Sequence, residues 1–224
     1  MSERSELEVA EVELRAADGR VPGRRGRATR TRLLECTAAM LATTSLRDLK
    51  VIDIAREACT SPATFYQYFP DVESAILVLA EDMAVDTSTL AGHVRSSDWR
   101  GKAGYQSALD LTDRFIEFWE QYRPVLRVVD LATGEGDRRF TRIRSRMLNE
   151  VTVALSDAIK VAQPKPPGDE PLDPTATAGV LVAMLANVAS HRYGFEFWGI
   201  RTSEARRSMA HLIFWSVTGQ RPPA

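Results

Sequence analysis

The sequence has little cysteine and no long apolar run. Its 224 residues include only Cys36 and Cys59, which are too few for a disulfide framework. The longest apolar stretch without charge or proline, residues 179–189, is too short to cross a bilayer, which takes about 20 residues. Residues 1–19 carry six acidic residues and no apolar core, so they do not form a secretory signal. We therefore expect a cytoplasmic protein with no membrane partner.

The spacings that mark common metal and catalytic sites are also missing. The three histidines have no second ligand residue three or four positions away, which argues against a metal site. The chain contains no glycine-rich phosphate loop, nucleophile elbow or C-x-x-C pair. We therefore expect no metal, no cofactor and no enzymatic activity. A cofactor-independent enzyme in the second half of the chain is a less favoured alternative.

Charge is nearly balanced overall but is segregated along the chain. The net charge is −1, yet residues 1–19 hold six acidic against two basic residues, and residues 20–70 hold nine basic against four acidic residues. Basic residues concentrated beside the first helical segment indicate a polyanionic partner. Residues 1–28 lack an apolar period and contain several glycines and a proline, so we expect a disordered arm, acidic and then arginine-rich. The arm is expected to contact DNA, although a solubilising tail is the alternative reading.

Apolar residues recur every three or four positions through the rest of the chain, and no segment alternates with the period of a strand. The fold class is therefore all-α. Five prolines between residues 163 and 174 predict a surface loop there. Helices are expected at 29–43, 50–58, 61–69, 71–94, 102–121, 123–133, 138–162, 174–198 and 203–218.

The second and third of these helices predict a helix-turn-helix. Ser61 can cap the third helix, and Pro62 suits its first position, where no N–H is needed. Phe65 and Phe69 lie four residues apart and form the expected buried face. The opposite face then carries small polar groups that can reach base edges in a major groove. Those residues are Ala63, Thr64 and Gln67, with Tyr66 and Tyr68 at the flanks.

The stretch from Ile54 to Phe69, IAREACTSPATFYQYF, closely resembles the signature of TetR-family transcriptional regulators, roughly I-A-x-x-A-G-V-S-x-x-T-[FL]-Y-x-Y-F. Two positions depart from the pattern. Cys59 stands where the family usually has glycine, at a cost of about 1 kcal/mol if φ is positive there. Val72 stands where the family often has a phosphate-binding lysine, and Lys50 is a candidate for a compensating phosphate contact.

The resemblance implies a DNA-binding domain over residues 29–74 and an effector-binding and dimerisation domain over 75–224, with about nine helices in total. It also implies a homodimer joined through residues 174–218 and a palindromic operator of double-stranded DNA. With the helix-turn-helix pattern, it gives the expected DNA-binding residues, which are Arg30, Lys50, Ser61, Ala63, Thr64, Tyr66, Gln67 and Tyr68.

A small effector is expected to bind in the C-terminal domain. Phe115, Trp119 and Tyr122 form an aromatic stripe at helical spacing, and Asn187 is a lone amide within an apolar stretch. We interpret these four residues as the lining of a mostly apolar effector site, although plain core packing and an internally bonded amide are the alternatives. The resemblance thus implies a ligand-responsive regulator, and the habit of the family makes it a repressor that the effector releases. A sequence-tolerant architectural DNA-binding protein without an effector is the second hypothesis.

Overall fold

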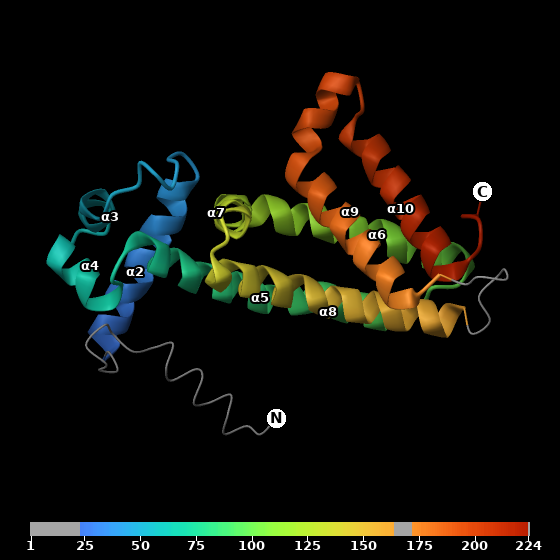
Figure 1. Cartoon of the computed structure of the whole chain (residues 1–224), viewed down its shortest axis with the longest axis horizontal. Helices are drawn as coiled ribbons and strands as arrows, with labels where there is room; N and C mark the ends of the chain where they lie inside the picture. The colour runs from blue at the N-terminus through green and yellow to red at the C-terminus, as the bar shows by residue number, and fades with distance from the viewer. Residues whose placement is uncertain (1–22, 164–171, 224) are drawn as a thin grey trace. The chain divides into compact units, whose positions relative to one another are not determined.

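The structure, a computed structural model, describes residues 23–163 and 172–223, and within these ranges it contains helices and no strands (Figure 1). The expected all-α class with about nine helices is confirmed for this part of the chain. The helices are α2 (Arg24–Leu41), α3 (Val51–Glu57), α4 (Pro62–Tyr68), α5 (Val72–Ser96), α6 (Gly101–Gln121), α7 (Arg123–Gly134), α8 (Arg138–Ala162), α9 (Pro174–Phe195), the short 3-10 helix η1 (Glu196–Trp198) and α10 (Thr202–Thr218). None of these described helices is both long and apolar enough to cross a membrane.

The described chain divides into two compact units. Unit 1 comprises residues 23–82 and 124–141, and unit 2 comprises residues 83–123, 142–163 and 172–223. Helices α5 and α8 therefore each begin in unit 1 and end in unit 2. This division differs from the boundary expected near residue 74, because residues 124–141 group with the N-terminal helices. The functions assigned to 29–74 and 75–224 stay predictions.

The first helix begins five residues earlier than expected. Helix α2 starts at Arg24, with Gly23 as its N-cap, so the expectation of a disordered arm is wrong for residues 24–28. The rest of that arm, residues 1–22, lies outside the described residues. Arginine favours helices almost as well as alanine, and Arg24, Arg25 and Arg27 are exposed. These first turns extend the helix but add no apolar residues to the core. A prediction based on the spacing of apolar residues therefore could not detect them.

The core of unit 1 joins the N-terminal helices. Leu33 of α2, Ile54 of α3, Phe65 of α4 and Ile76 of α5 are completely buried, and α2 contacts both α3 and α4. Burying a side chain of this size stabilises a fold by about 1.5–3 kcal/mol. Helices of seven residues, such as α3 and α4, are marginal in isolation. Their shape therefore depends on this shared core.

Unit 2 is built around α6, which packs against α9 and α10. Leu111, Phe115 and Phe214 are buried in its core. At its margins two ion pairs join the helices, Arg206 with Asp113 and Arg192 with Glu120. The expected helix 174–198 ends earlier than predicted, at Phe195, and Gly199 turns the chain toward α10 with φ at +70°.

Candidate nucleic-acid interface and effector region

The turn between α3 and α4 has left-handed backbone at Cys59, where φ is +53°. The N–H of Cys59 donates to the carbonyl of Arg56 at 3.0 Å, and the N–H of Thr60 donates to the carbonyl of Ala55 at 2.8 Å. These two bonds satisfy carbonyls at the end of α3, as in a Schellman-type C-cap. Glycine adopts this conformation without strain, whereas a cysteine is strained by about 1 kcal/mol.

The start of α4 is fixed by its own side chains. The Ser61 hydroxyl accepts the N–H of Thr64 at 3.1 Å, and Pro62 occupies the first turn, which confirms the expected cap. The hydroxyls of Ser61 and Thr64 also lie 3.0 Å apart. Thr64 is half-buried and engaged with Ser61, so its hydroxyl is less available to a base edge than the sequence suggested.

The two faces of α4 are separated as the sequence predicts. Phe65 is fully buried and Phe69 is 2% exposed, with their ring centres 5.5 Å apart. Ala63, Tyr66 and Gln67 are exposed, and Tyr68 is half-buried. An exposed glutamine amide on a short helix, flanked by a small residue, can bond bidentately to a base edge.

The basic residues near α4 divide into two groups. The Arg30 guanidinium lies over the Phe69 ring, 5.4 Å from its centre, and the residue is half-buried. Arg30 therefore has a packing contact in addition to its expected DNA role. Lys50 is exposed at the N-cap of α3, and Arg24, Arg25, Arg27 and Arg32 are exposed on α2. Exposed basic groups of this kind suit phosphate contacts.

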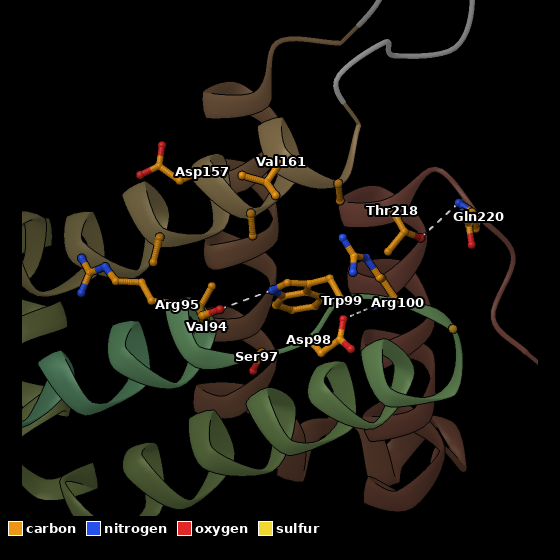
Figure 2. A pocket seen from close by; sticks show the side chains of 14 residues that line it. Val94, Arg95, Ser97, Asp98, Trp99, Arg100, Asp157, Val161, Thr218 and Gln220 are labelled. Carbon is orange, nitrogen blue, oxygen red and sulfur yellow. Dashed lines mark hydrogen bonds between the residues drawn. The ribbon is translucent and has the colours of Figure 1, made fainter.

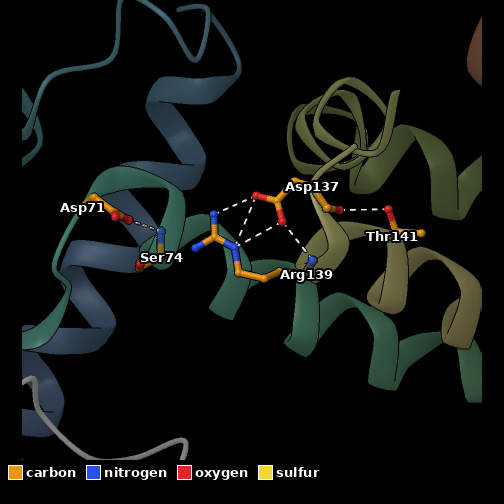
Figure 3. Close-up of polar contacts among 5 residues, drawn as sticks. All are labelled: Asp71, Ser74, Asp137, Arg139 and Thr141. Atoms are coloured by element: carbon orange, nitrogen blue, oxygen red, sulfur yellow. Dashed lines mark hydrogen bonds and ion pairs between the residues drawn. The ribbon is translucent and has the colours of Figure 1, made fainter. Parts of the chain in front are cut away.

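An acidic and basic cluster lies where α5 and α8 begin (Figure 3). The Asp71 carboxylate accepts the N–H of Ser74 at 2.7 Å and so caps α5. Arg139 donates to Asp137 at 2.7 Å, and this bond, above all, lowers the pKa of Asp137 to about 2. The same bond is the main cause that raises the pKa of Arg139, and the charges of Asp71 and Glu73 add to it. Acidic residues, Asp71 and Glu73, therefore flank the half-buried Val72, which stands where the resembling family often has a lysine.

The aromatic residues expected at an effector site are brought together on α6. Phe115 and Trp119 are buried and stacked, with ring centres 5.3 Å apart and planes within 15°. The Tyr122 ring packs on Phe118, and its hydroxyl donates to Asp86. The indole N–H of Trp119 is buried and has no hydrogen-bond partner in the described part of the chain. A buried donor left unbonded costs about 1–3 kcal/mol, so an acceptor on a ligand would be favoured here.

Asn187 does not join this group. It is exposed on α9, so the expectation of a buried amide is wrong for the single chain. Apolar residues lie on all sides of α9, and its periodicity therefore does not indicate which side is buried. Asn187 instead shares an exposed stripe with Val180 and Ala183.

A second exposed stripe runs along α10. Leu212 is 47% exposed and Trp215 is 56% exposed, with His211 beside them. These residues line a shallow groove together with Arg207. A tryptophan and a leucine so exposed on neighbouring turns are typical of an interaction surface.

Unit 2 also contains a cavity of about 700 Å³ that sequence patterns did not predict, where α5 ends and α6 begins (Figure 2). Trp99, in the turn between these helices, lies in the middle of the labelled lining residues in this view, with α8 and the end of α10 nearby. None of the four expected effector residues lines this cavity. The only local signal was Trp99 itself, a large aromatic in a polar turn.

Comparison with known proteins gives matches in family and in fold. A family model described as a tetracyclin repressor-like C-terminal domain matches residues 90–224. Among solved structures, a TetR-family transcriptional regulator from Streptomyces coelicolor is 15% identical, with a TM-score of 0.64, over 86% of this chain and 82% of that one. A regulator of the same family from Rhodococcus sp. is 17% identical, with a TM-score of 0.61, over 85% of this chain and 99% of the other. No curated protein matches by sequence.

Proposed function

The chain belongs to the TetR family of transcriptional regulators, and from this premise we propose that it is a repressor that binds a palindromic operator as a homodimer. We further propose that a small, mostly apolar effector releases it from DNA. Such a protein acts in the cytoplasm, where the chromosome lies. Members of the family are transcriptional regulators and not enzymes, so the enzymatic alternative is set aside.

The observation that carries DNA binding is the division of α4 into two faces. Phe65 and Phe69 anchor it to the core, and Ala63, Tyr66 and Gln67 are left exposed. A recognition helix needs this division, because one face must be held rigidly while the other enters the major groove. Exposed Lys50 and the α2 arginines supply phosphate contacts, which position the helix without reading sequence.

Dimerisation is supported by the exposed apolar stripes of α9 and α10, within residues 174–218. Ala183 and Leu212 are both exposed in the single chain, so neither belongs to its core. A two-fold pairing of these stripes would remove the Leu212 and Trp215 side chains from water and give the protein two DNA-reading heads. Two heads related by two-fold symmetry require two half-sites in the operator.

Effector binding near Phe115 and Trp119 is supported by the unbonded indole N–H. Aromatic walls supply affinity, and one buried donor fixes the orientation of a ligand. A ligand releases the protein only if it prefers the conformation that cannot reach both half-sites. A coupling of about 1–3 kcal/mol would lower operator affinity by about 5–150-fold.

The decisive experiment selects bound sequences from random duplexes and compares their affinity with that of unselected DNA. Gln67→Ala is expected to cost about 1–3 kcal/mol on the selected site only. Lys50→Ala is expected to weaken binding to every sequence and to reduce the salt slope by about one unit, whereas Lys102→Ala, at an exposed lysine on α6, should change neither. Equal affinity for selected and random DNA would favour the architectural alternative.

A further inference from the structure

The cavity at the α5–α6 turn has walls held by hydrogen bonds, and the exposed arginines Arg95 and Arg100 are among its lining residues (Figure 2). We propose that it is a second ligand site, separate from the Phe115–Trp119 cluster, for a carboxylate with an apolar tail. Its volume of about 700 Å³ lies within the range of about 300–1,000 Å³ that small-molecule sites occupy. The proposal rests on how the walls are held, on which polar groups are already bonded and on what the apolar surface requires.

The wall formed by the turn is fixed in place. The Trp99 indole N–H donates to the carbonyl of Val94 at 3.3 Å. The Ser107 hydroxyl of α6 donates to the carbonyl of Asp98 at 3.1 Å. Gly104 of α6 lies directly against the Trp99 backbone. With its turn tied to both flanking helices, the cavity keeps its shape without a ligand, which limits the ordering cost of binding.

The opposite wall is tied together by a single amide. The Gln163 side chain, immediately after α8, donates to the carbonyls of Ser216 and Val217 at 2.8 and 3.0 Å. These are carbonyls of the last turn of α10 that have no partner within the helix. The ends of α8 and α10 are thereby held beside each other, so this side of the cavity does not depend on apolar packing alone.

The carboxylates around the cavity are already engaged, whereas its guanidinium groups are not. Asp98 accepts the backbone N–H of Arg100 at 3.0 Å, and Asp157 accepts from Lys160 at 3.1 Å. Arg95 and Arg100 both line the cavity, and neither side chain has an ion pair or hydrogen bond in the described residues. Guanidinium groups bind carboxylates bidentately. These unbonded guanidinium donors are therefore open to an anionic acceptor.

The remaining surface of the cavity is apolar. A small anion without a tail would leave this surface exposed to water. Ala154, Ala158 and Ala162 recur at every fourth position along α8, and each lines the cavity. Their methyl groups leave the space open, and Val161 beside them is 81% exposed. Covering such a surface is favourable by about 25 cal/mol for each Å². In Figure 2 the two guanidinium groups lie on opposite sides of Trp99. An acyl or aryl tail along α8, with its carboxylate at one of these two guanidinium groups, satisfies both parts of the site.

The test measures direct binding to the full-length protein by calorimetry, with decanoate and decylammonium as a matched pair of probes. We expect decanoate to bind and decylammonium to bind at least about tenfold more weakly, since the tail is shared and only the charge differs. The double variant Arg95→Gln, Arg100→Gln should weaken decanoate about tenfold or more. Arg114→Gln, at an exposed arginine on α6, is the matched control and should bind as the wild type does.

A second variant tests the apolar part of the site. Ala158→Leu fills the cavity and should reduce decanoate affinity at least about tenfold, whereas Ala39→Leu, at an exposed alanine on α2, should leave it unchanged. Circular dichroism shows whether each variant is folded. If Ala158→Leu does not fold, the decanoate affinity of the arginine double variant is the test of the proposal. No decanoate binding, equal binding of the two probes, or wild-type affinity in the arginine variant would each overturn the proposal. Operator binding is measured in a separate experiment. A negative result for decanoate therefore does not contradict the proposed DNA-binding function.

Discussion

Gly104 lies so close to Trp99 that a β-carbon at position 104 would come within 2.3 Å of the Trp99 carbonyl carbon. Atoms of a backbone cannot move away as the end of a flexible side chain can. Position 104 therefore admits only glycine unless the turn from Ser97 to Arg100 shifts. This contact joins the start of α6 to the turn that shapes the cavity, and it leads to the first prediction.

Gly104→Ala should destabilise the protein by about 1–3 kcal/mol, because the added methyl group overpacks a fixed contact. Gly92→Ala is the matched control, since Gly92 lies within α5 and has nothing within 4 Å of an added β-carbon. That substitution should stabilise the protein by about 0.5–1 kcal/mol. Urea unfolding of the three proteins measures both effects, and equal shifts in the two variants would contradict the prediction.

Cys59→Gly should stabilise the protein by about 0.5–1 kcal/mol. Glycine relieves the strain of φ at +53°, and the added freedom of the unfolded chain offsets part of the gain. Cys59→Ala keeps a β-carbon and should give no such gain. Thermal unfolding compares the variants, and an alanine variant as stable as the glycine variant would show that the sulfur group, rather than the backbone, is responsible.

Removing Glu120 should destabilise unit 2, because it leaves the charge of Arg192 without its carboxylate. The Arg192 side chain is only 8% exposed, but the Glu120 side chain is 49% exposed, so solvent screening reduces the expected cost of Glu120→Ala to about 1–3 kcal/mol. Glu117→Ala, at an exposed position on the same helix, is the control. Chemical denaturation of both variants near neutral pH measures the difference.

The same pair predicts a dependence on pH. The hydrogen bond from Arg192 lowers the pKa of Glu120 below its usual value of 4.5. A carboxyl whose pKa is lowered by folding stabilises the folded state at pH above the unfolded pKa and loses that contribution as the pH falls through the folded pKa. Wild type and Glu120→Ala should therefore converge in stability as the pH is lowered below 4.5.

Asp137 should titrate near pH 2, well below its ordinary value of 3.8, because Arg139 donates to its carboxylate. In Arg139→Gln that pKa should rise toward 3.8. Carbon-detected NMR of the side-chain carboxyl follows the titration directly. A midpoint that does not change between the two proteins would mean that the bond shown in Figure 3 does not persist in solution.

Leu212→Arg should convert the proposed dimer to a monomer, because it places a charge on the exposed stripe of α10. Val85→Arg is the matched control, at a valine on α5 that is 70% exposed and outside the predicted interface. Sedimentation at micromolar concentration distinguishes the two species. A monomeric wild type with undiminished operator affinity would contradict the dimer proposal.

Features set by neighbouring residues could be predicted from the sequence. Ser61 and Pro62 begin α4 through contacts within one turn, and the spacing of Phe65 and Phe69 indicates its buried face. Features set by packing between distant segments could not. Asn187 lies on a helix that is apolar all round, so its exposure depends on which side α6 covers. The cavity beside Trp99 requires the ends of α5, α8 and α10 to meet, and no local pattern encodes that meeting.

The hydroxyl pair of Ser61 and Thr64 limits how much sequence information the proposed recognition helix α4 can read. With Thr64 half-buried and bonded within the helix, Gln67 is the main exposed side-chain amide that can distinguish one base from another. A helix with so few side chains that can bond to base edges specifies few base pairs in each half-site. We therefore expect a degenerate operator in which the distance between half-sites, fixed by the two-fold pairing, contributes as much to target choice as the bases themselves.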